Sequence, residues 1–166
     1  MSLLFLIYQI AFSISFNSGI YHISVCINSN SSNILHDIAV ELTASTIEEL
    51  FICAVDAWNK AMLDAEILYD DEKIKLDFEA DSLEELLVNF LSEVNYLFLS
   101  KNWFCTGVED INLHKNGGYK MTARLAGLNV QPTKIDFKEE IKAVTYHQLE
   151  IKKANGSYST RIVFDI

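Results

Sequence analysis

The stretch KIKLDFEADSLEELLVNFLSEVNYL, residues 73–97, decides the fold class because two hydrophobic periods meet within it. Its first eight residues alternate between polar and apolar, which is typical of a strand with one buried face. From 83 onward the apolar residues recur every three or four positions, which is the period of an amphipathic helix. We therefore expect a strand at 73–80 that is followed directly by a helix.

An earlier segment has the same helical period. Its apolar residues from 47 to 62 again fall at steps of three and four. Ser45 precedes Glu48 by three positions, which is the offset of a capping box, and Ser82 precedes Glu85 by the same offset. The sequence thus predicts two helices that begin in the same way.

Five further segments have the composition or alternation of strands. Asn155-Gly156, between the last two of them, favours the positive backbone angles of a tight hairpin. Two helices among about six to seven strands, joined mostly as hairpins, predict an α+β fold in which the helices pack on an antiparallel sheet. The five segments are 38–42, 103–113, 119–125, 141–152 and 158–165.

Composition limits the partners of the chain. Its 166 residues, half of them hydrophobic, suit one domain with a proper core. Lys and Arg number 13 against 23 Asp and Glu, which gives a net charge of −10. Such a field repels nucleic-acid backbones, so we expect no direct nucleic-acid binding. A protein partner with a basic surface, or a cation, fits this charge better.

The three cysteines indicate a reducing compartment. Their odd number and unpaired spacing argue against a disulfide scaffold and against a zinc site of thiolates. Cys53 falls in the apolar stripe of the first predicted helix. We expect its thiol to be buried in the core and unreactive.

Residues 1–33 differ from the rest of the chain. The run from 3 to 16 is apolar, and no Lys or Arg occurs before Lys60. The run lacks the basic leader and clear cleavage site of a secretory signal, and it is shorter than the ~20 residues of a membrane helix. Secretion is therefore disfavoured and no stable membrane association is expected. Three interpretations stay open: an extra strand or helix that covers the core, a signal-like segment, or a misassigned gene start.

A polar tract separates this segment from the domain that we predict at 34–166. Residues 28–33, NSNSSN, have the composition of a linker. Nothing in 34–166 has the form of a glycine-rich phosphate loop, a dinucleotide fingerprint, a nucleophile elbow or a His-Glu-x-x-His helix. We accordingly assign no catalytic residue and no site for an organic cofactor.

Three polar residues remain after the solvated helix faces and turns are set aside. Asp37 stands between apolar residues just before a predicted strand, and Asp165 stands next to the last residue. His147 lies on the predicted strand at 141–152, where a structural, hydrogen-bonded role is the simpler interpretation. By spacing alone these are weak signals.

Three blocks of the sequence resemble the archease family. Residues 140–147, EIKAVTYH, are similar to the family's Glu-[Val/Ile]-Lys-Ala-x-Thr-Tyr-His strand, and 161–166, RIVFDI, to its terminal x-Asp-[Ile/Val]. The block at 81–91 is similar to the second helix of the family. Asp37-Ile38 with 45–51 is similar to the strand and first helix that follow the family's His-Thr-Ala-Asp motif.

The early motif departs from the family pattern. Here it reads Ile34-Leu35-His36-Asp37, so the aspartate is retained while the histidine is out of register. Whether His36 replaces the family's histidine is left open by the sequence. The resemblance covers about 34–166, and residues 1–33 resemble no part of the family.

The resemblance implies an accessory protein and not an enzyme. Archeases promote guanylylation and multiple turnover of an RtcB-type, GTP-dependent RNA ligase in tRNA splicing and RNA repair. The implied location is the cytoplasm, or also the nucleus in a eukaryote. The family's divalent metal, calcium or else manganese or magnesium, would be held here by Asp37, Asp165 and the terminal carboxylate of Ile166. Such a set suits a hard cation, because three carboxylates repel one another unless a cation lies between them.

Two other functions stay open. A stand-alone metal-dependent hydrolase would use Asp37, Asp165 and His147, although no nucleophile or phosphate loop accompanies them. A metal-free, chaperone-like interaction module would use exposed apolar surface at the amino terminus.

Overall fold

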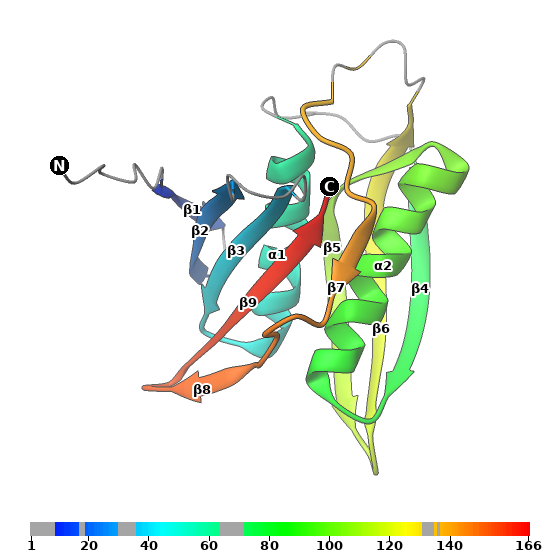
Figure 1. Ribbon diagram of the computed structural model, residues 1–166. Helices are drawn as coiled ribbons and strands as arrows, with labels where there is room; N and C mark the ends of the chain where they lie inside the picture. Colours follow the sequence, from blue (N-terminus) through cyan, green and yellow to red (C-terminus); the bar gives the residue numbers. More distant parts are fainter. Residues whose placement is uncertain (1–8, 17–18, 30–35, 64–71, 131–134, 136) are drawn as a thin grey trace, which may run out of the picture.

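The computed structural model describes residues 9–16, 19–29, 36–63, 72–130, 135 and 137–166. Within these ranges the chain has two helices and nine strands, and the strands form two antiparallel sheets (Figure 1). The large sheet has the order β1-β2-β3-β9-β7, with β8 also paired to β9, and the small sheet has the order β4-β6-β5. In chain order the elements are β1 (Gln9–Phe16), β2 (Gly19–Ser29), β3 (His36–Ala44), α1 (Ile47–Met62), β4 (Glu72–Ala80), α2 (Leu83–Lys101), β5 (Trp103–Lys115), β6 (Tyr119–Asn129), β7 (Ala143–Thr145), β8 (Lys152–Ala154) and β9 (Ser157–Asp165).

The α+β class with antiparallel pairing is confirmed, but the strands are more numerous than expected and lie in two sheets. One cause is the segment 141–152, which the sequence predicted as a single strand. It contains β7 and only Lys152, the first residue of β8, because the chain turns between the two strands: Gln148 has a φ of 56° and the Leu149 N–H donates to the Tyr146 carbonyl at 3.1 Å. The prediction of one strand there is wrong.

Strand β1 pairs with β2, and β2 pairs with β3, so this hairpin widens the large sheet. Asn28 and Ser29, the start of the predicted linker, are the last residues of β2. The remainder of that tract and residues 1–8 lie outside the described residues. Neither described helix is long and apolar enough to cross a membrane.

Both helices begin with the kind of side-chain cap that the sequence predicted, but the capping residue of α1 is one position later than predicted. In α2 the Ser82 hydroxyl accepts from the Glu85 N–H at 3.1 Å, as expected. In α1 the cap is Thr46 and its partner is Glu49, each one residue later than predicted. Since β3 continues to the buried Ala44, the chain needs one more residue before the helix can begin.

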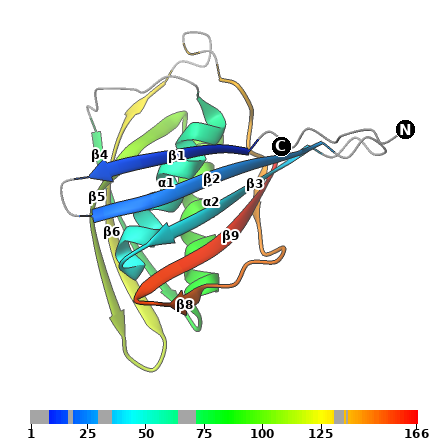
Figure 2. The ribbon, with the colours of Figure 1, turned by 90° about the vertical axis from the view of Figure 1, so that its left-hand side faces the viewer.

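The helices lie against the inner faces of the sheets. Helix α1 contacts β2, β3 and β9 of the large sheet and β5 of the small one, while α2 contacts the small sheet and β7. Figure 2 shows the large sheet in front with the helices behind it. At the centre, Trp58 of α1 packs on Phe104 of β5, with ring centroids 5.2 Å apart, and on Phe98 of α2 at 6.1 Å. These aromatic contacts join α1 to the small sheet and to α2.

Candidate metal centre

Asp37 and Asp165 lie directly opposite each other in the pairing of β3 with β9. Residues opposite each other in an antiparallel pair project to the same face, with Cβ atoms about 4.5–5.5 Å apart. Both side chains are half-buried. The structure therefore brings together two carboxylates that are 128 positions apart in the sequence, by the difference of their residue numbers.

The pair faces away from the helices. Ile38 and Phe164, the neighbours of the two aspartates, both belong to the hydrophobic core, so the aspartates project to the opposite face of the sheet. On the other side of β9, Ala143 of β7 pairs with Asp165, and its small side chain is exposed. The Lys142 N–H donates to the Asp165 carbonyl at 2.8 Å and ties the main chain there. The pair is thus partly open to solvent, and β2 and β7 flank the two strands that carry it.

Ile166 follows Asp165 directly, and its side chain packs against the core while the residue stays half-buried. This contact holds the main chain of residue 166 beside the aspartate pair. The sequence-based set of Asp37, Asp165 and Ile166 is therefore gathered at one end of the large sheet.

The histidines have other positions. His36 begins β3 as the Cα partner of Ser29, one residue before Asp37. His147 is exposed and follows the end of β7, so its predicted place on a strand is wrong. Its N–H donates to the Thr145 hydroxyl at 3.4 Å. Because Ala143 is the residue opposite Asp165, the register does not bring His147 to the aspartates.

The donor set suits a hard cation in an open site. In the part of the chain that the structure describes, no three His, Cys, Asp or Glu side chains are grouped to hold a metal ion. Two aspartates supply at most four oxygens, whereas calcium takes about six to eight and magnesium about six. A cation here would keep coordination positions for water, for the carboxylate at residue 166 and for a partner's oxygens.

Two of the three cysteines are placed for packing. Cys53 and Cys105 are fully buried, and burial raises the pKa of both thiols, that of Cys105 to about 12. Alkylation needs the thiolate, so iodoacetamide at mildly alkaline pH is expected to leave Cys53 and Cys105 unlabelled in the native protein and to label both of them in guanidinium. Peptide mass spectrometry measures this. Rapid labelling of either thiol before unfolding would contradict the burial argument.

Comparison with known proteins agrees with the sequence blocks. The model of the Archease protein family (MTH1598/TM1083) matches residues 35–166. A protein archease from Methanosarcina barkeri is 34% identical over 131 residues, which cover 78% of this chain and 90% of the relative. One from Pyrobaculum neutrophilum is 31% identical over 137 residues, with 78% and 89% covered.

Solved structures share the fold. The solution structure of protein 1598 from Methanobacterium thermoautotrophicum matches with a TM-score of 0.68 at 21% identity, over 88% of this chain and 98% of that one. A crystal structure from Thermotoga maritima, described as an archease and possible chaperone, matches with a TM-score of 0.57 at 21% identity, over 84% and 99%. Family model, relatives and fold agree, and this chain belongs to the archease family.

Proposed function

We propose that this chain is an accessory protein of RNA ligation, which activates an RtcB-type, GTP-dependent RNA ligase in tRNA splicing or RNA repair. It acts in the cytoplasm or nucleus and has no catalytic cycle of its own. Membership of the archease family supports this function. The net charge of −10 supports a protein partner over direct contact with RNA.

The observation that carries the proposal is the pairing of Asp37 with Asp165. Like charges directly opposite each other on a sheet are destabilising, by about 0.2–1 kcal/mol for such a pair. A divalent cation between the carboxylates turns this repulsion into attraction, and its preferred ligands are oxygens. Calcium, manganese and magnesium all meet this description.

The residues of the chain have simple tasks in this mechanism. Asp37 and Asp165 would hold the cation, and a terminal carboxylate at residue 166 would add a third anionic group. Since the pair faces away from the core, the partner can approach it without rearrangement of the helices. A cation bound there would supply positive charge that offsets phosphate charge at the ligase's nucleotide site.

Reconstitution tests the function. With substoichiometric ligase, GTP, manganese and a split RNA, adding the chain should raise the product several-fold above one equivalent of ligase. Ligase alone should stay near one equivalent. A matched control is Glu41→Gln, which removes an exposed carboxylate from the outer face of β3, opposite Arg161, and should stimulate like the wild type. Absence of stimulation with several cognate ligases would refute the proposal.

The role of residue 166 has its own prediction. Adding one alanine after Ile166 moves the terminal carboxylate away from the aspartate pair and leaves Asp37 and Asp165 unchanged. We expect the affinity for manganese to fall by roughly tenfold, because one anionic ligand is lost while two stay. Isothermal titration calorimetry of the two chains measures it. Equal affinities would show that Ile166 supplies no ligand.

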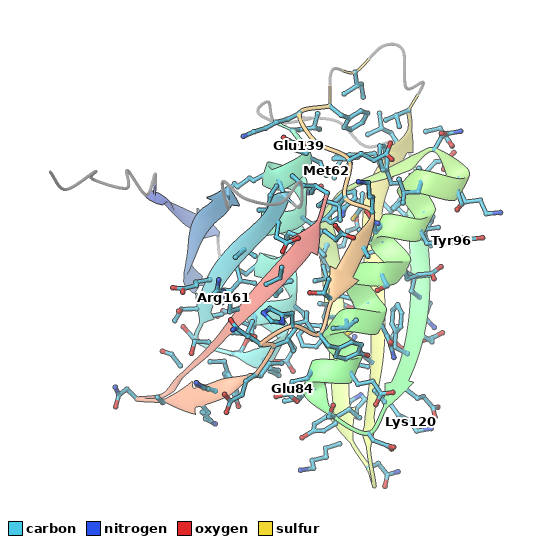
Figure 3. All side chains as sticks on the ribbon, viewed as in Figure 1. Met62, Glu84, Tyr96, Lys120, Glu139 and Arg161 are labelled. Atoms are coloured by element: carbon cyan, nitrogen blue, oxygen red, sulfur yellow. The ribbon has the colours of Figure 1, made fainter. Side chains whose placement is uncertain are left out.

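A chaperone-like function is the second candidate. Three large apolar side chains are exposed among the described residues: Tyr96 and Leu99 on α2, at 48% and 41%, and Tyr146 at 56%. Figure 3 shows Tyr96 projecting outward from α2. If this surface is the functional one, suppression of aggregation of a model substrate should fall in Tyr96→Ser and be insensitive to chelators and to Asp165→Asn.

A hydrolase would be recognised by turnover without any partner. The purified chain with GTP, a phosphate monoester or RNA should release product in a metal-dependent reaction that Asp165→Asn abolishes. We expect no turnover, because the β7–β9 register places Ala143, and not His147, opposite Asp165.

A further inference from the structure

The chain that leads into β7 crosses the ends of both helices before it reaches the aspartate pair. Its last part, residues 137–142, has no regular secondary structure, and we call it the strap. At its first end the Phe137 ring lies 4.8 Å from that of Phe98. Next to it, the Lys138 N–H donates to the carbonyl of Met62, the last residue of α1, at 2.9 Å. Figure 3 shows Met62 and Glu139 close together at the upper end of the molecule.

The second end of the strap is tied to α2 and to β9. Ile141 is fully buried, and its carbonyl accepts from the side-chain amide of Asn95 at 2.8 Å. The next residue, Lys142, donates its N–H to the Asp165 carbonyl at 2.8 Å. Two consecutive residues of the strap thus link a helix side chain to the main chain of the aspartate pair.

Asn95 is the unusual member of this link. It is 4% exposed, on a face of α2 that is otherwise apolar, and Thr160 is the one other buried polar residue among those of 37–166 whose burial is described. Its Oδ1 accepts from the Trp58 indole N–H at 3.0 Å, while its Nδ2 donates to Ile141. The two bonds orient the amide, since a buried polar group without a partner is costly.

We propose that Asn95 is a positioning residue for the cation site: it holds the Ile141 carbonyl, which fixes the strap and, through Lys142, the main chain of Asp165 opposite Asp37. Strand β7 has only three residues and pairs with β9 alone, so its own ladder is too short to secure this edge. The cation readout below rests on the proposed function, and the hydrogen-exchange readout does not.

Three substitutions separate the two hydrogen bonds of Asn95. Asn95→Leu removes both. Asn95→Asp keeps an acceptor for Trp58 but, when ionised, places a carboxylate oxygen against the Ile141 carbonyl. The matched control is Trp58→Phe, which removes the bond to Trp58 and leaves the bond to Ile141.

The first readout is amide hydrogen exchange at Lys142, with the central β6 residue Ala123 as reporter of global unfolding. In Asn95→Leu the Lys142 amide should exchange roughly tenfold faster or more, beyond any change at Ala123, because a buried carbonyl loses its partner. In Trp58→Phe the two amides should change together. An unchanged ratio in Asn95→Leu, or an equal loss in Trp58→Phe, would overturn the proposal.

Acidity offers an independent check with Asn95→Asp. Burial raises the pKa of such a carboxyl, and its protonated form can donate to Ile141 as the amide did. After correction for intrinsic exchange, Lys142 protection should therefore be high at acidic pH and be lost as pH rises through the raised pKa. Protection that equals the wild type throughout this range would contradict the role of Asn95.

The second readout is the affinity for manganese. Substitution behind a metal ligand typically costs about 10–100-fold in affinity, so Asn95→Leu and Asn95→Asp at neutral pH should bind at least about tenfold more weakly. Trp58→Phe should stay within about twofold of the wild type. Equal manganese affinity in the wild type and all three variants would overturn the proposal that Asn95 positions the cation site. If the wild type binds no manganese, the proposed metal site fails, and the exchange at Lys142 still decides whether Asn95 holds the strap.

Discussion

Replacing Asp165 by Asn is expected to weaken divalent-cation binding at least about 100-fold, since even substitutions behind a ligand cost about 10–100-fold. Asn keeps the shape of the side chain but removes the charge that opposes Asp37 across the β3–β9 pair. The stimulation of the ligase should be lost with the cation. Calorimetric titration with manganese or calcium measures the affinity, and the ligase assay measures the consequence.

Compared with the wild type, the Asp165→Asn variant should be more stable without cation and less stable with cation. In a chelator, Asp165→Asn relieves the repulsion and should raise the free energy of unfolding by about 0.2–1 kcal/mol. With cation at 100 times its dissociation constant, the wild type gains about 2.7 kcal/mol and the variant gains little. The stability of Glu41→Gln relative to the wild type should not change sign when cation is added. If Asp165→Asn binds the cation with the same affinity as the wild type, the proposed metal site is wrong.

The largest effect on stability is expected at Gly127. A Cβ built at this residue would lie 2.4 Å from the Phe104 carbonyl oxygen and 2.4 Å from the Trp103 ring. Both neighbours belong to buried residues of β5, so neither can retreat cheaply. Overpacking of this kind costs about 3 kcal/mol, at the upper end of the usual range. Gly127→Ala should accordingly lower the melting temperature by about 10 °C.

Gly107 is the matched control for this prediction. It lies on β5 beside a register shift, its φ is not in the left-handed region, and a Cβ there would meet nothing within 4 Å. Gly107→Ala should therefore melt within about 2 °C of the wild type. Thermal unfolding followed by circular dichroism compares the two. Equal melting temperatures for Gly127→Ala and Gly107→Ala would mean that β5 and β6 are packed differently at Trp103.

Local periodicity was a good guide to the helices. The three- and four-residue steps from 47 to 62 and from 83 to 97 correspond to α1 and α2 almost to their ends. The helix start at Thr46 was missed by one residue because Ser45 with Glu48 and Thr46 with Glu49 have the same spacing. Only the length of β3 distinguishes the two.

Strand assignments were less certain because pairing decides them. The segment 141–152 has the composition of a strand, yet its middle turns away from the sheet and only its ends pair with β9. The buried amide of Asn95 was missed altogether. It stands in an apolar helical stripe, and no local pattern reveals that its partners are Trp58 and Ile141.

The sequence by itself determined the fold class, the two helices and the family, because hydrophobic period, capping chemistry and motif blocks are local properties of the chain. It also named Asp37 and Asp165, through the resemblance. Only the tertiary structure decided that these carboxylates lie opposite each other, on which face of the sheet they stand, and how the strap reaches them. The physical reason is that strand register and buried hydrogen bonds join residues far apart in the chain, whose separation leaves no trace in any local pattern.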